Sequence, residues 1–188
     1  MNRRMSWLLW FVVISQGVLC QTKKLVILIG VDWEGMHLRE PNIRAMERFR
    51  KKFPGIPLIH FLNPAYFTKA RDHQHEDLRR RIMRTVHPGD EHALHLHAWR
   101  SFVEDAGVPF RQGPRWDASF LEGLCFGDCG YSVPLYVYDD EELADLLQRA
   151  KRILIAQGFQ EPKSFRAGGW MANEKVLRVL AAEGFLAD

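Results

Sequence analysis

The sequence predicts an α/β fold, either a parallel sheet or a (β/α) barrel, from three observations. Residues 24–31 form a continuous apolar run rich in β-branched residues, which is typical of a parallel strand covered on both faces. Helical patterns then alternate with further short apolar runs, and this alternation occurs four times before a fifth run begins at 185–188. The length of 188 residues, 47% of them hydrophobic, suits one domain with a sizeable core.

The first half of the chain supplies two strand-helix units. After the first strand, residues 41–53 place apolar side chains at helical spacing, with Asn42 near the start and Pro-Gly beyond the end. Residues 56–62 then predict a second strand. A second helix follows, in which apolar residues recur every four positions: Leu78, Ile82 and Val86.

The second half opens with a third predicted strand at 91–98. Residues 100–138 are rich in Gly, Pro and aromatic residues, and we expect an irregular lid over the strand ends rather than a plain connection. Residues 139–158 form the clearest helical pattern, with acids at the start and Gly158 at the end. A fourth strand at 163–168 and a helix capped by Asn173 complete the pattern. The aromatic residues of the lid expected at 100–138 are Phe110, Trp116, Phe120, Phe126 and Tyr131.

The N-terminus has the layout of a secretory signal peptide: a short basic region, an apolar stretch and a cleavage point after Cys20. We therefore expect residues 1–20 to be removed and residues 21–188 to form a secreted, periplasmic or cell-envelope domain. The apolar stretch is shorter than the roughly 20 residues that span a bilayer, so no stable membrane span is expected in the mature chain. The formal charge of +3 is scattered, which argues against a nucleic-acid partner.

Two cysteines remain after such cleavage, Cys125 and Cys129. An even count in an oxidising compartment favours a disulfide that closes a small loop. Two free thiols are the alternative. A zinc site at this pair needs two more ligands, and none is evident nearby in the sequence.

Candidate site residues lie at the ends of two predicted strands. Asp32 and Glu34 are two apart, so they share a face if the first strand extends that far. The same alternation in the third strand puts His95 and His97 on one face, while the leucines between them face the helices. Because the carboxyl ends of parallel strands meet at one edge, the four groups predict a metal site with a second carboxylate as base.

The fourth strand adds further candidates at the same edge. Arg166 is placed to hold a carboxylate by ion pairing, which keeps it ionised and oriented. Gly168 and Gly169 let the backbone approach a ligand closely and offer N–H groups to a developing oxyanion.

Three motifs in order resemble the polysaccharide deacetylase family, the NodB-like carbohydrate esterases. They are "GVDWEG" at 30–35, "GDEHALHLHAW" at 89–99 and "SFRAGGW" at 164–170. The resemblance covers residues 24–188. It implies a distorted (β/α) barrel that uses one divalent metal ion, usually zinc, to remove N- or O-linked acetyl groups from the sugars of a polysaccharide.

Carried onto this sequence, the resemblance makes Asp32 the base, Glu34 and His95 metal ligands, and Arg166 the group that orients the base. The second histidine of the family falls four residues after the first, where this chain has Trp99. His97 is therefore taken as the second histidine ligand from strand alternation alone. The roles of Asp32 and Glu34 stay interchangeable at this stage. The substrate-binding residues assigned from the motifs are Trp99, Gly168, Gly169 and Trp170.

The later motifs of the family, including its general-acid histidine, would lie beyond Asp188, and no histidine follows His97. The resemblance thus implies the N-terminal part of a barrel, with deacetylation expected of a C-terminally extended form and little of these residues alone. Two alternatives stay open. One is a non-catalytic or degenerate carbohydrate-binding module of the same fold. The other is a metal-dependent amidohydrolase, which also uses His-x-His but normally on its first strand.

Overall fold

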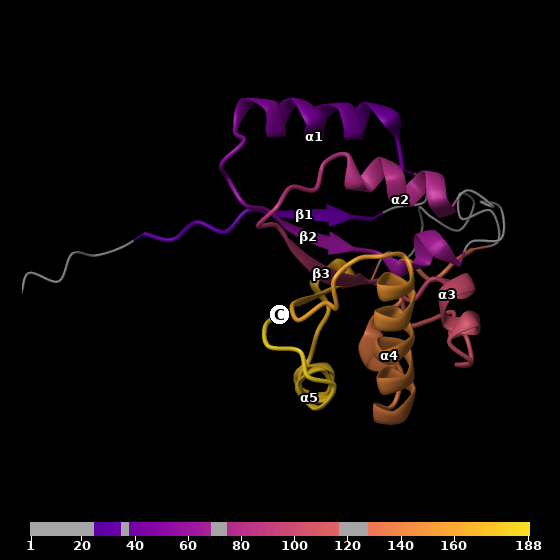
Figure 1. Ribbon diagram of the computed structural model, residues 1–188. Helices are drawn as coiled ribbons and strands as arrows, with labels where there is room; N and C mark the ends of the chain where they lie inside the picture. The colour runs from indigo at the N-terminus through magenta and orange to yellow at the C-terminus, as the bar shows by residue number, and fades with distance from the viewer. Residues whose placement is uncertain (1–24, 35–37, 69–74, 117–127) are drawn as a thin grey trace, which may run out of the picture.

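A computed structural model describes residues 25–34, 38–68, 75–116 and 128–188 of the chain (Figure 1). Within these residues the four strands form a parallel sheet in the order β1-β2-β3-β4. Each strand lies beside its predecessor in the chain, as in a (β/α) barrel. In a doubly wound sheet the order of the strands reverses at a switch point. The predicted α/β class is confirmed, and the described strands make up part of a barrel. The strands are β1 Gly30–Trp33, β2 Ile59–Leu62, β3 Glu91–Leu96 and β4 Phe165–Ala167.

Helices connect the strands and cover the sheet on its outer side. Figure 1 shows α1 and α2 running beside β1 and β2, with α4 and α5 on the far side of β3. Short 3-10 turns follow β2 and β4, at the carboxyl edge of the sheet. The helices are α1 Glu40–Lys52, α2 His75–Met83, α3 Arg100–Asp105, α4 Asp140–Ala156 and α5 Glu174–Ala182. The 3-10 turns are η1 Pro64–Phe67, η2 Leu135–Val137 and η3 Gly168–Trp170.

The ends of α4 and α5 follow from local chemistry. Asp139 caps α4 in a reciprocal capping box with Glu142, and the first turn is acidic, which suits the positive end of the helix dipole. After this helix Gly158 adopts a left-handed φ of 81°, which glycine tolerates better than other residues. Asn173 caps α5 by accepting a hydrogen bond from the N–H of Val176, as predicted.

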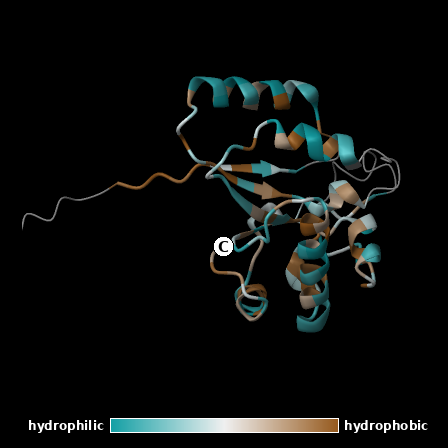
Figure 2. Ribbon diagram, in the orientation of Figure 1, coloured by the Kyte–Doolittle hydropathy of each residue, from teal (hydrophilic) through white to brown (hydrophobic). Residues whose placement is uncertain are grey.

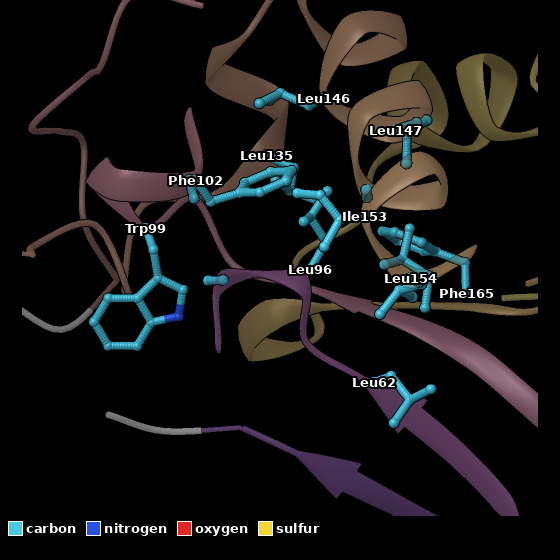
Figure 3. Packing of buried hydrophobic residues seen from close by; sticks show 14 of the residues in the cluster. Leu62, Leu96, Trp99, Phe102, Leu135, Leu146, Leu147, Ile153, Leu154 and Phe165 are labelled. Carbon is cyan, nitrogen blue, oxygen red and sulfur yellow. The ribbon is translucent and has the colours of Figure 1, made fainter. Parts of the chain in front are cut away.

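The core lies between the outer face of the sheet and the helices. Leu96 and Phe165 point from β3 and β4 toward the apolar stripe of α4, where Ile153 and Leu154 meet them (Figure 3). Leu94 pairs with Phe165 and shares this face of the sheet. The solvent sides of the helices are largely hydrophilic (Figure 2). His95 alternates with Leu94 and Leu96 along β3 and therefore lies on the opposite, inner face of the sheet.

An isolated parallel bridge forms where the sequence predicts a fifth strand. It joins Ser164, directly before β4, to Ala187. The N–H of Phe165 donates to the carbonyl of Ala187 at 2.9 Å, and the N–H of Leu186 donates to the carbonyl of Lys163 at 2.8 Å. The chain near Ala187 therefore runs parallel to β4 at this edge of the sheet.

The first predicted strand is longer in the sequence pattern than in the structure. Residues 25–28 lie outside the sheet in an extended arm (Figure 2). The side chain of Leu25 is 86% exposed. Ladder pairing with β2 begins at Gly30, opposite Ile59. Pro57 precedes that point on β2 and has no N–H to donate, which ends the ladder and leaves the arm without a neighbour on this strand.

One other local prediction is corrected. Residues 100–138 are not wholly irregular, because α3 and η2 lie within them. Helix α1 begins at Glu40 with Asn42 in its first turn, near the start as predicted, and the N-cap Arg39 makes no side-chain capping bond. Pro41 at the start of this helix sets the backbone there instead.

Some predictions fall outside the described residues: the signal peptide at 1–20, and Cys125, Phe120 and Phe126 of the predicted lid. Cys129 is described and is disulfide-bonded. Among the helices of the described ranges, none combines the length and apolar character that a membrane span requires.

A buried polar network on the outer face ties α1 to the sheet. Asp90 accepts hydrogen bonds from Arg50, from His60 at 3.1 Å and from the N–H groups of Leu58 and His87. The other ring nitrogen of His60 accepts from the indole N–H of Trp33 at 3.0 Å. Burial opposes the ionisation of Asp90, but its hydrogen bonds outweigh burial and lower its pKa to about 2.

Replacing Asp90 by Ala should lower the free energy of unfolding by about 3–5 kcal/mol, because Arg50 then stays buried without its counter-ion. Chemical denaturation followed by circular dichroism measures this loss. Asp77→Asn, which removes only an exposed ion pair with Arg80, should change the midpoint little.

A second substitution, Asp90→Asn, tests the pH dependence of this contribution. Because folding depresses the pKa of Asp90 from 3.8 to about 2, its contribution is complete above pH 4 and disappears as the pH falls toward 2. The stability difference between wild type and Asp90→Asn should therefore shrink over that window. A difference that stays constant from pH 5 to pH 2 contradicts the assigned role.

Candidate metal centre and adjoining ion pair

The register of the sheet places the predicted polar residues on its inner face. Asp32 pairs with Phe61, which in turn pairs with Ala93. Two residues beyond Ala93 on the same strand, His95 pairs with Arg166. Paired residues of parallel strands point to the same side, so these side chains share the face opposite the helix-packed leucines.

Glu34, His95 and His97 converge on one point at the carboxyl edge of this face. The Oε2 atom of Glu34 lies 3.0 Å from Nε2 of His95 and 2.9 Å from Nε2 of His97. The two Nε2 atoms are 3.1 Å apart. Both imidazoles are buried, whereas the Glu34 side chain is 38% exposed, so the cluster opens toward solvent on the carboxylate side.

The other ring nitrogens define the tautomers of the two histidines. Nδ1 of His95 lies 3.0 Å from the carbonyl oxygen of Arg166, and Nδ1 of His97 lies 2.7 Å from that of Tyr131. A carbonyl oxygen only accepts, so each Nδ1 carries the proton and donates it. In the neutral imidazoles both Nε2 atoms are then acceptors, and they face a carboxylate oxygen that is also an acceptor.

Three acceptors at such short separations require a cation between them, either protons or a metal ion. When the imidazoles are protonated, hydrogen bonds from His95 and His97 lower the pKa of Glu34 and outweigh the opposing effect of burial, so the carboxylate is ionised. Two histidines and one carboxylate are a known catalytic zinc set. Tetrahedral bonds of about 2.0–2.2 Å separate ligand atoms by roughly 3.3–3.6 Å. The observed separations of 2.9–3.1 Å are a few tenths of an ångström below the lower end of that range, so small side-chain shifts fit the residues to a metal ion.

Asp32 is not part of this cluster and pairs with Arg166 instead. Nη1 of Arg166 donates to Oδ1 of Asp32 at 2.5 Å. The guanidinium carbon lies 3.8 Å from the centre of the Phe61 ring and 4.8 Å from that of Trp170, so the cation rests between two aromatic faces. These contacts hold the arginine, which in turn holds the carboxylate in one orientation.

Tyr66 anchors the backbone of Glu34, although sequence reasoning did not identify it. Its hydroxyl donates to the Glu34 carbonyl oxygen at 2.7 Å. Burial raises the pKa of Tyr66, so it stays a protonated donor. The side chain of Asn63 caps η1, the turn that carries Tyr66, by accepting from the N–H of Ala65. The turn η1 directly follows β2, at the edge of the sheet that carries the site. This location is the one sequence signal that points to Tyr66.

The glycines after β4 lie against aromatic rings of the site. A Cβ atom on Gly168 would lie 2.4 Å from Nδ1 of His97, so the backbone packs directly on the imidazole. Gly169 has a φ of 62°, and a Cβ atom there would lie 2.7 Å from the indole nitrogen of Trp116. Substitution at either position therefore displaces a ring of the site.

The two tryptophans assigned to substrate binding have opposite environments. Trp170 is 77% exposed and has a left-handed φ of 60°, which is unusual for a bulky residue and directs the ring outward beside Arg166. Trp99 is 1% exposed within the hydrophobic core, so its assignment to substrate contact is corrected (Figure 3). Trp99 is the N-cap residue of α3, and its ring lies near those of His97 and Tyr131.

The predicted lid does lie at the carboxyl edge where it is described. The ring of Tyr131 stacks on His97, and the ring of Trp116 contacts Tyr131 at 5.8 Å between centroids.

The backbone carbonyl groups of Tyr131 and Arg166 accept hydrogen bonds from the two histidines. No sequence pattern predicts these contacts, because every residue has a carbonyl group.

Comparisons with known proteins give limited likenesses. No protein-family model matches this chain, and no curated protein matches it. Among solved structures, one similar fold is a putative polysaccharide deacetylase from Mycobacterium smegmatis, at 17% identity and a TM-score of 0.44 over 76% of this chain. Another is a family 4 carbohydrate esterase from Streptomyces lividans in complex with acetate, at 10% identity and a TM-score of 0.47 over 86%. This chain spans 35% and 60% of those two chains, respectively.

Proposed function

We propose that the protein is a metal-dependent hydrolase that removes acetyl groups from the sugars of an N- or O-acetylated polysaccharide. The observation that carries the proposal is the convergence of three acceptor atoms beside a separately held carboxylate. Glu34, His95 and His97 suit a divalent ion, with zinc the preferred candidate for a nitrogen-rich set. The glycan class rests on the three sequence motifs.

The bound ion would supply a Lewis acid that activates water and polarises an acyl carbonyl. Asp32 is the base in this proposal, because it lies on the same face as the ligands and makes its own contact with Arg166. It accepts a proton from the attacking water as the water oxygen bonds to the acyl carbon. The carbon–nitrogen or carbon–oxygen bond to the sugar then breaks, the leaving nitrogen or oxygen takes up the proton held by Asp32, and acetate is released.

Arg166 and Trp170 give this edge its capacity to recognise a sugar. The guanidinium keeps Asp32 aimed while the exposed indole offers an apolar face on which a pyranose ring can stack. The bend at Gly168 and Gly169 brings the backbone close to His97, where N–H groups suit a developing oxyanion.

We also propose export from the cytoplasm. The signal-like pattern of residues 1–20 supports this, and so does the disulfide at Cys129, since such bonds persist in oxidising compartments. A polysaccharide of the cell envelope or surroundings is the corresponding substrate class.

Metal content is expected to depend on the three converging residues. Purified protein should contain about one zinc ion per chain, and His95→Ala, His97→Ala and Glu34→Ala should each reduce this severalfold. Elemental analysis after dialysis against a metal-free buffer gives the stoichiometry. His87→Ala is the matched control, because that imidazole lies outside the cluster. Metal content that ignores all three ligand substitutions would refute the site.

Asp32→Asn should separate catalysis from metal binding. This change should lower kcat for acetate release by about 10²–10⁴-fold and leave the zinc content unchanged. Arg166→Met should act in the same direction with a smaller effect, because Asp32 then loses its partner. Enzymatic quantification of acetate from an acetylated chito-oligomer and from peptidoglycan provides the readout. A zinc-loaded protein that binds these glycans but releases no acetate would instead be a binding module.

A further inference from the structure

The orientation of His97 depends on a segment far away in the sequence. Its Nδ1–H donates to the carbonyl oxygen of Tyr131 at 2.7 Å, across 34 positions of the chain. The ring of Tyr131 also stacks on the imidazole, with centroids 4.2 Å apart and an angle of 12° between the planes. One residue thus determines both the tautomer and the plane of the imidazole.

Tyr131 belongs to a short segment, residues 128–131, that is fastened to the start of α3. Asp128 accepts from the N–H of Ser101 at 2.8 Å and from its hydroxyl at 2.9 Å. The N–H of Arg100 donates to the carbonyl oxygen of Cys129 at 2.7 Å. These bonds satisfy N–H groups that the first turn of a helix leaves without partners.

Gly130 lets this segment approach the end of β3. It has a φ of 106°, and a Cβ atom there would lie only 2.0 Å from the carbonyl oxygen of Ala98, the residue after His97. It would also lie 2.8 Å from the ring of Phe110. Any side chain at this position must push the segment away from β3, and the carbonyl of Tyr131 would move with it.

The ring of Tyr131 also contacts two tryptophan rings. Trp99 lies 5.4 Å from it and Trp116 lies 5.8 Å from it, between ring centroids. The buried Trp99, which cannot contact a substrate, therefore has a place in the structure as support for the stack.

We propose that residues 128–131 are the outer support of the candidate metal centre, with Tyr131 as a positioning residue for the ligand His97. The inference rests on the metal site of the proposed function and extends it. The segment keeps the Nε2 lone pair of His97 directed at the point shared with Glu34 and His95, before any ion binds. Metal affinity should therefore depend on residues that never touch the metal.

Gly130→Ala tests this inference most directly, with Gly184→Ala as its matched control. Gly184 has a comparable left-handed φ of 78°, but a Cβ atom there meets nothing within 4 Å. Zinc dissociation constants come from competition with a chromogenic chelator, and the visible absorption of the Co²⁺-substituted protein reports ligand geometry. We expect Gly130→Ala to bind zinc about 10–100-fold more weakly with an altered Co²⁺ spectrum, and Gly184→Ala to match wild type in both.

Tyr131→Leu and Tyr131→Phe form a second pair in case Gly130→Ala does not fold. Leu removes the stacked ring and should weaken zinc binding, whereas Phe keeps the ring and should restore wild-type affinity and spectrum. If every folded variant of the two pairs binds zinc with wild-type affinity and spectrum, the inference about residues 128–131 is wrong. The proposed metal site itself is then unaffected. A wild-type protein that binds no zinc overturns the proposed metal centre and this inference with it.

Discussion

The parallel register of β3 against β4 places His95 beside Arg166, and the whole candidate site depends on that pairing. It sets the imidazole where its Nδ1–H reaches the carbonyl of Arg166, and it brings the guanidinium to the face that carries Asp32. Because side chains alternate along a strand, a shift of one residue would turn these groups into the helix layer and expose the leucines. The apolar outer face therefore stabilises the register on which the polar inner face relies.

Histidines on the two faces of the sheet differ in whether both ring nitrogens have complementary hydrogen-bond partners. On the outer face, His60 accepts from Trp33 and donates to Asp90, so both ring nitrogens have complementary partners. On the inner face, His95 and His97 each use their one proton on a carbonyl, and three acceptor atoms are left facing each other. The first arrangement is complete by itself, whereas the second requires a cation. This difference separates a structural imidazole from a metal ligand on physical grounds.

Each residue of the cluster is held by a different part of the chain. Tyr66 fixes the backbone of Glu34, β4 fixes His95, and the segment at Tyr131 fixes His97. These supports come from η1, from the neighbouring strand and from the long connection after α3. The positions of the three ligand atoms therefore depend on packing in several parts of the domain. Glycine occupies positions such as 130 and 168, where the backbone packs too closely against the site for a side chain.

The sequence by itself determined the class of fold, the alternation of elements and the face on which Asp32, Glu34, His95 and Arg166 lie, because strand alternation and helical periodicity are local properties. Tertiary structure alone decided the rest. Only packing distinguished Glu34, which meets the histidines, from Asp32, which meets Arg166, since both acids satisfy the same alternation. Burial of Trp99, the early end of the β1 ladder at Pro57 and the carbonyl contacts of the histidines likewise depend on neighbours distant in the chain, and no local pattern encodes them.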